Sequence, residues 1–91
     1  MFELRLKRKH KLGLKKGKAA AQQVAEELER EFDMVNEWDG HTLRFSRIGV
    51  AGSLVVTRDW VEMQARLAGL LKAFRPRIEM RMQDYLDRYF G

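Results

Sequence analysis

The first hydrophobic positions of the chain alternate with charged ones. Phe2, Leu4 and Leu6 are each followed by a charged residue. A period of two residues is typical of a strand with one buried face. The alternation stops at the basic cluster of residues 8–11, so we expect a first strand over about residues 2–7.

The next segment changes to a helical period. Apolar residues recur at every fourth position, and this set is Ala20, Val24, Leu28 and Phe32. Glutamine, glutamate and arginine, Glu27 among them, occupy the other face. The pattern predicts an amphipathic helix from about residue 15 to residue 32.

Asp39 and Gly40 form a strong signal for a two-residue hairpin turn, because both tolerate positive φ angles. A turn at these two residues pairs Trp38 with His41 in two strands at about 34–38 and 41–47. The apolar residues that this pairing places on one face are Met34, Trp38, Leu43 and Phe45. One buried face is what an antiparallel pair requires.

Two further strands are expected after this hairpin. Gly49 and Gly52 indicate a turn before a β-branched strand at residues 53–58. Strict alternation then predicts a fifth strand, whose apolar positions are Val61, Met63, Ala65 and Leu67. Residues 69–74 are apolar without alternation, which fits a bend or a short helix.

Pro76 suits the first turn of a last helix, where its missing N–H costs nothing. The apolar stripe of this helix is Ile78, Met82, Tyr85, Leu86 and Tyr89. The predicted fold is α+β, with an antiparallel sheet, the order β-α-β-β-β-β-α, and both helices packed on one face. Ninety-one residues suffice for one core, so residues 1–91 are expected to form a single domain.

Composition adds a charge asymmetry to this picture. The net charge is +5, but residues 1–18 carry eight basic side chains against one acidic one, and the remainder is slightly acidic. Cysteine is absent, which excludes disulfides and thiolate chemistry. Neither a signal peptide nor an apolar stretch of membrane-spanning length is recognisable, so we expect a cytoplasmic protein without a transmembrane segment.

The basic segment is the first candidate binding region. Its candidate anion-binding or partner-binding residues are Arg5, Lys7, Arg8, Lys9, His10, Lys11, Lys15, Lys16 and Lys18. These residues could neutralise nucleic-acid phosphates, with Trp38 or Trp60 stacking on a base. They would equally suit an acidic protein or an anionic surface. The glycine-containing stretch 13–18 fails the spacing of a phosphate-binding loop, so we interpret it as a flexible loop.

Several short motifs together resemble a known family. In chain order they are residues 8–13 (RKHKLG), 24–28 (VAEEL), 38–45 (WDGHTLRF), 49–52 (GVAG), 67–71 (LAGLL) and 78–79 (IE). The chain resembles the polyhydroxyalkanoic acid system family, small bacterial proteins associated with storage-polyester granules. The resemblance implies a granule context and no defined activity or catalytic residues.

Catalytic chemistry is not expected. Ser46 and Ser53 have no base placed beside them by any pattern, and His10 and His41 are best interpreted as solvated. Nor do the two histidines have metal-ligand spacing, so no catalytic, metal or cofactor site is predicted. The last helix should mostly pack on the sheet, leaving Met80 and Phe90 as candidate apolar surface residues.

Three functions follow as hypotheses. The first is a non-catalytic accessory protein that binds a granule surface or a granule-associated protein, with an apolar C-terminal stripe beside the basic segment. The second is a small nucleic-acid-binding module that uses the basic N-terminal segment. The third is an apolar-ligand carrier of helix-grip type, which requires an internal pocket bounded by the last helix. Sequence does not predict the oligomeric state.

Overall fold

The structure is a computed structural model that describes residues 4–91. Its elements in chain order are β1 (Leu4–Lys9), α1 (Gly13–Phe32), β2 (Val35–Asp39), β3 (Thr42–Arg47), β4 (Val50–Val56), β5 (Trp60–Leu67), the 3₁₀ helix η1 (Gly69–Phe74) and α2 (Arg75–Phe90). This confirms the predicted α+β order β-α-β-β-β-β-α. Phe2, where the first strand was expected to begin, lies outside the described residues.

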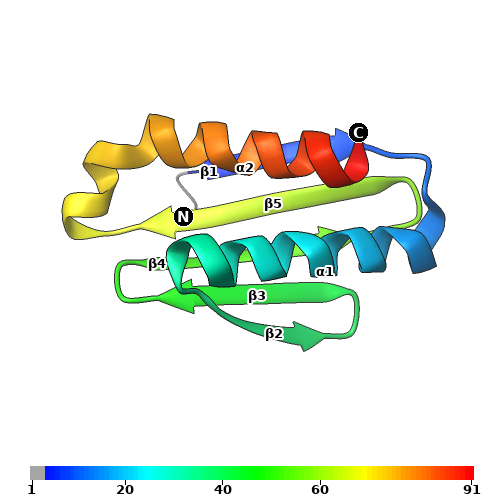
Figure 1. The fold of residues 1–91 in the computed structure, drawn as a ribbon, viewed down its shortest axis with the longest axis horizontal. Coiled ribbons are helices and arrows are strands. Elements are labelled where there is room, and N and C mark those ends of the chain that lie inside the picture. Colours follow the sequence, from blue (N-terminus) through cyan, green and yellow to red (C-terminus); the bar gives the residue numbers. More distant parts are fainter. Residues whose placement is uncertain (1–3) are drawn as a thin grey trace.

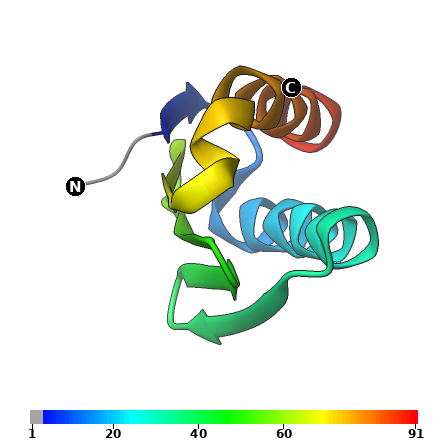
Figure 2. The same ribbon diagram turned by 90° about the vertical axis from the view of Figure 1, so that its left-hand side faces the viewer.

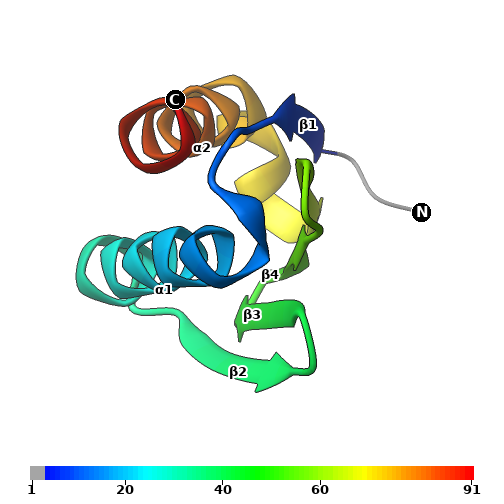
Figure 3. The same ribbon diagram turned by 90° about the vertical axis from the view of Figure 1, so that its right-hand side faces the viewer.

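The strands form one antiparallel sheet in the order β1-β5-β4-β3-β2. α1 carries the chain from β1 at one edge of the sheet to β2 at the other, and α2 lies beside it on the same face (Figure 1). Views along the two ends show one layer of helices and one of strands (Figures 2 and 3). Both helices therefore cover one face, as predicted, and we term the other side the helix-free face.

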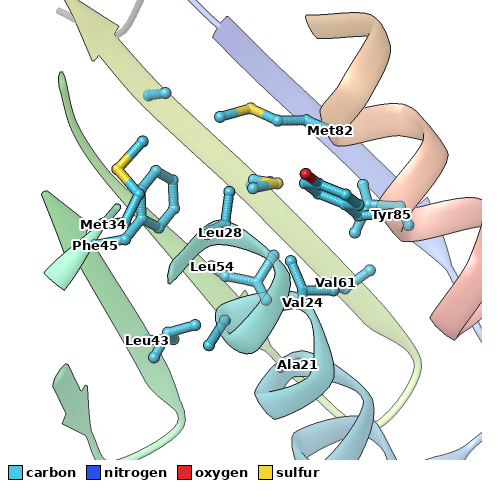
Figure 4. Packing of buried hydrophobic residues seen from close by; sticks show 14 of the residues in the cluster. Ala21, Val24, Leu28, Met34, Leu43, Phe45, Leu54, Val61, Met82 and Tyr85 are labelled. Atoms are coloured by element: carbon cyan, nitrogen blue, oxygen red, sulfur yellow. The ribbon is translucent and has the colours of Figure 1, made fainter. Parts of the chain in front are cut away.

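The core lies between these two layers. The inward strand residues include all four apolar positions predicted in the fifth strand, and α1 contributes a stripe of small side chains. From the helices, the buried apolar residues are Ala20, Ala21, Val24, Ala25, Leu28, Met82, Tyr85, Leu86 and Phe90. Figure 4 shows Val24 and Leu28 of α1 facing Leu54 and Val61 of the sheet. Alanine on α1 lets the helix approach the strands closely.

The hairpin register differs from the prediction. Trp38 pairs with Leu43, and Asp39 pairs with Thr42, so the two turn residues are Gly40 and His41. The predicted pairing of Trp38 with His41 is wrong by two positions. Side chains alternate with a period of two, so a shift of two leaves each residue on its predicted face. Leu43 is accordingly buried.

Gly52 is not the turn residue that the sequence suggested. β4 begins at Val50, and the turn before it contains Gly49, whose φ is +90°. Gly52 lies inside β4 opposite Phe45. An added Cβ at Gly52 would lie 2.6 Å from Cζ of Phe45, closer than non-bonded carbon atoms approach. Gly52 is thus the place where the Phe45 ring packs on the strand.

α1 and α2 run antiparallel and are joined through two carboxylates one helical turn apart. Glu27 accepts hydrogen bonds from Arg88 Nη1 (2.8 Å) and the Tyr89 hydroxyl (3.0 Å). Glu31, one turn later, contacts Arg81 and Tyr85. Glu27 is 4 % exposed, so its predicted place on the solvent face of the helix is wrong. Its negative charge is stabilised because α2 brings an arginine and a phenol to it.

Candidate functional site

The basic residues predicted as a binding site do not form one surface. Arg5, Lys7 and Lys9 lie on the helix-free face of the sheet. They alternate along β1 with Leu4 and Leu6, which face the helices. The other lysines lie on α1 or just before it, in the layer across the sheet, and are Lys11, Lys15, Lys16 and Lys18. The sheet divides the charge into two groups.

Two arginines of β1 are already paired within the molecule. Arg5 Nε donates to Glu62 Oε2 at 3.2 Å across the β1–β5 ladder. Arg8, near the end of the same strand, forms an ion pair with Asp87 of α2. Exposed pairs of this kind contribute little stability, but they reduce the positive charge that β1 offers to a partner.

Both tryptophans are covered by lysines. The Lys7 ammonium lies 4.7 Å from the centre of the Trp60 ring, and the Lys18 ammonium lies 4.9 Å from that of Trp38. In a cation–π contact at such a distance, the lysine occupies one face of the ring on which a base could otherwise stack. Nucleic-acid binding by the basic segment stays a prediction.

His10 and Phe90 are buried together. The His10 Nε2 atom lies 3.0 Å from the main-chain oxygen of Thr57, and Nδ1 accepts a hydrogen bond from the Leu12 amide at 3.1 Å. The Phe90 ring lies 5.4 Å away, centre to centre. The predictions of a solvated His10 and a surface Phe90, which is 5 % exposed, are wrong. The loop after β1 turns inward and closes the core against the end of α2.

The predicted loop at residues 13–18 is also wrong, because these residues form the first turns of α1. Gly17 is buried there. A Cβ at this position would lie 3.0 Å from Cγ1 of Val56 and 3.1 Å from Cε1 of His10. The glycine therefore serves close packing of the helix on the sheet.

A cavity of about 540 Å³ opens at the other end of the molecule. It lies between the end of α1, the β3–β4 turn, η1 and the start of α2, the end that faces the viewer in Figure 2. Its apolar lining consists of Phe32, Met34, Ile48, Val50, Leu71, Phe74, Ile78 and Met82. Its charged lining consists of Glu31, Arg47, Arg77 and Arg81. The third hypothesis required a pocket bounded by the last helix, and α2 borders this one.

The cavity results from how the chain enters α2. η1 extends the chain past the sheet before α2 begins, and the Ala68 amide donates to the Gly49 carbonyl at 2.9 Å. Gly49 also allows Leu71 to approach, since a Cβ there would lie 2.8 Å from Leu71 Cδ1. η1 is thereby attached to the β3–β4 turn, and the space behind it is left without filling side chains.

Among the large hydrophobic residues exposed at this end, those in the β3–β4 turn and η1 are Ile48, Leu70 and Phe74, and we term these residues the apolar end. Ile48 is 96 % exposed in the β3–β4 turn, and Leu70 is 86 % exposed in η1. Met80 of α2 is 64 % exposed, as predicted, but does not line the cavity. Clustered exposed hydrophobic residues beside a cavity mark a binding surface more often than single ones do.

One wall of the cavity carries a charge network. Glu31 accepts hydrogen bonds from Arg81, with Nε–Oε1 at 2.8 Å and Nη2–Oε2 at 2.5 Å, and from the Tyr85 hydroxyl. The bonds from Arg81 and then Tyr85 lower the pKa of Glu31. Burial, followed by the bond to Glu31, raises the pKa of Tyr85 well above its usual value. The network fixes the α1–α2 distance at the cavity.

These shifts predict a stability plateau with two declining limbs. Because the pKa of Glu31 is lowered on folding, its contribution is present above its ordinary value of 4.5 and is lost as the pH falls through the folded value. Because the pKa of Tyr85 is raised, its contribution is present below 10.0 and is lost as the pH rises. Urea unfolding across the pH range should show both limbs.

Glu31→Gln is the matched variant for this prediction. It keeps an oxygen acceptor for Tyr85 but has no charge to lose, so its acid limb should be shallower than that of the parent protein. The alkaline limb should also weaken, because Tyr85 no longer faces an anion. Identical pH profiles for the two proteins would contradict the assignment.

Residues 4–91 contain neither a metal-binding group nor a membrane-spanning helix. Within residues 4–91, histidine, aspartate and glutamate form no group of three or more that could hold a metal ion. No helix in the same range has the length and apolar character needed to cross a bilayer. The cavity and the apolar end are thus the features that a function can be built on.

Sequence patterns do not predict the cavity, because its lining comes from α1, β3, β4, η1 and α2 and from two of the connections between elements. The single available signal was the apolar run at residues 69–74, whose lack of alternation left its hydrophobic side chains without a buried face. That run is η1, and none of its residues is fully buried.

Comparison with known proteins supplies a family. Residues 4–90 match the family model described as "Putative polyhydroxyalkanoic acid system protein". Neither the curated proteins nor the solved structures contain a significant match to the chain. The family match covers all the elements described above, which confirms the resemblance inferred from the short motifs. The chain belongs to the family of polyhydroxyalkanoic acid system proteins.

Proposed function

We propose that this protein is a non-catalytic accessory protein of the polyhydroxyalkanoate system that binds the granule surface, or a protein on it, through the apolar end. The observation that supports this most directly is the exposure of Ile48 and Leu70 on neighbouring elements. Family membership supplies the granule context.

The chemistry of the apolar end suits an interface with an apolar polymer or its protein coat. Ile48, Leu70 and Phe74 project from a turn and a short helix, so they can be buried without moving the core. Arg47 and Arg77 line the adjoining cavity and would interact with anionic groups at the rim of such an interface. Burying a large aliphatic side chain contributes about 1.5–3 kcal/mol, so two of them dominate the contact.

The proposal differs in one respect from the hypothesis drawn from the sequence. That hypothesis placed an apolar stripe beside the basic segment. In the folded chain the stripe of α2 is largely buried, and the loop at residues 10–12 lies at the end of the molecule opposite η1 (Figures 1 and 3). The arginines that accompany the apolar end are Arg47 of β3 and Arg77 of α2.

Co-sedimentation with purified granules tests the proposal. The double variant Ile48→Ser/Leu70→Ser should bind at least about tenfold more weakly than the parent protein, because two exposed anchors are removed. Met80→Ser is the matched control, since it removes an exposed hydrophobic residue that lies away from the cavity. Equal binding by the parent and the double variant, or equal loss with Met80→Ser, would contradict the proposed contact.

A further inference from the structure

The cavity has a mostly apolar lining that also includes Glu31 and three arginines, Arg47, Arg77 and Arg81, which we term the rim arginines. Its volume of about 540 Å³ lies within the range of about 300–1,000 Å³ typical of small-molecule sites. We propose that it binds an aliphatic carboxylic acid, with the hydrocarbon chain inside the cavity and the carboxylate at the arginine rim. This site would bind a small molecule. It shares Ile48 and Phe74 with the apolar end, and Leu70, which does not line the cavity, distinguishes the two.

Among residues 4–91, two of the three rim arginines form no ion pair with a carboxylate. Arg81 is neutralised by Glu31, which also accepts from Tyr85. Arg47 Nη1 donates to the main-chain oxygen of Phe32 at 2.6 Å, which satisfies the end of α1 but leaves the cation without an anion. Arg77 has no ion-pair partner within residues 4–91. The positive charges of Arg47 and Arg77 therefore suit an anionic ligand.

The interior selects against a polar ligand. Eight of the twelve lining side chains are apolar, and the other four are Glu31 and the three rim arginines. Polar groups along a ligand would lose their hydrogen bonds to water in such a lining and gain none, which costs affinity. Met34 and Met82 line it with flexible thioethers, which adapt to a chain of varying shape. An aliphatic chain with one terminal anion satisfies both parts of the site.

Calorimetric titration with decanoate below its micelle concentration is the primary test. Decanol has the same chain without the charge, and acetate has the charge without the chain. Decanoate should bind at least about tenfold more tightly than decanol, because charge-assisted hydrogen bonds to arginine are made only by the carboxylate. Acetate should show no saturable binding. Absence of decanoate binding, or equal affinity for decanoate and decanol, would overturn the proposal.

The variant Arg77→Gln tests where the carboxylate of the ligand binds. The residue is exposed and unpaired within the described range, so the variant should fold normally while binding decanoate several-fold to tenfold more weakly. Arg58→Gln is the matched control, because Arg58 is exposed in the β4–β5 connection at the opposite end. An unchanged affinity in Arg77→Gln, or an equal loss in Arg58→Gln, would overturn the assignment of the rim.

Leu70→Ser separates this site from the granule contact. Leu70 belongs to the apolar end but does not line the cavity. Decanoate affinity should be unchanged in Leu70→Ser, whereas granule binding should fall. A parallel loss of decanoate binding would show adsorption to the exposed surface and overturn the cavity proposal. Absence of granule binding by the parent protein, with decanoate binding intact, would count against the proposed function alone.

Discussion

Replacing Gly52 with alanine is expected to lower the free energy of unfolding by about 2–3 kcal/mol. Gly52 faces the core from β4, directly opposite Phe45. A Cβ would lie 2.6 Å from the Phe45 ring and would overlap the main-chain oxygen of Gln64. That oxygen belongs to β5, which is paired on both sides, so it cannot retreat without breaking the ladder. Urea unfolding at neutral pH measures the change.

Two companion variants separate this clash from a general effect of substitution. Ala51→Ser changes the neighbouring exposed residue on the helix-free face and should alter stability by no more than about 0.5 kcal/mol. Phe45→Leu removes the ring. The double variant should therefore lose less free energy of unfolding than the sum of the losses of Phe45→Leu and Gly52→Ala. Wild-type stability of Gly52→Ala, or strict additivity with Phe45→Leu, would contradict the packing described here.

Gly52 illustrates what sequence patterns could not resolve. A glycine within a β-branched segment is compatible with a turn, a bulge or a close contact. The deciding fact is the Phe45 ring on the neighbouring strand, and that contact depends on the β3–β4 register, which no sequence pattern predicted. The faces were nevertheless predicted correctly, because a period of two is insensitive to an even shift.

Element type and order could be predicted because each depends on local periodicity. The buried side chains of β5 and of α1 follow directly from patterns of two and four residues. Glu27 and His10 could not be placed this way. Their partners, Arg88 and Phe90, lie on α2, far along the chain. Polar residues with distant partners look solvated in a sequence.

The candidate site was the least accessible part for the same reason. The basic segment is recognisable in the sequence because its charged residues lie close together along the chain. In the folded protein the sheet separates them. The rim arginines come from β3 and α2, and no sequence window gathers Arg47 with Arg77. The charged side chains that line the cavity are brought together by the topology of the fold, at the end where η1 lies.

The network between the helices makes a second large effect predictable. Glu27→Ala should lower the free energy of unfolding by about 2–3 kcal/mol. The variant removes the acceptor for Arg88 and for the half-buried Tyr89 hydroxyl. The loss stays below that of a fully buried ion pair, because the Arg88 side chain is 58 % exposed and can be hydrated. Urea unfolding at neutral pH and low salt measures it.

Glu29→Ala provides the control for Glu27→Ala, because Glu29 is an exposed glutamate on the same helix. It should change stability by no more than about 0.5 kcal/mol.

Glu27 does not line the cavity, whereas Glu31 does. Glu27→Ala should therefore lower stability without changing decanoate affinity, and Glu31→Gln should change both. Equal stabilities of Glu27→Ala and Glu29→Ala would show that the carboxylate of Glu27 does not join the helices. An altered decanoate affinity in Glu27→Ala would show that the contacts of Glu27 and those of Glu31 act as one unit.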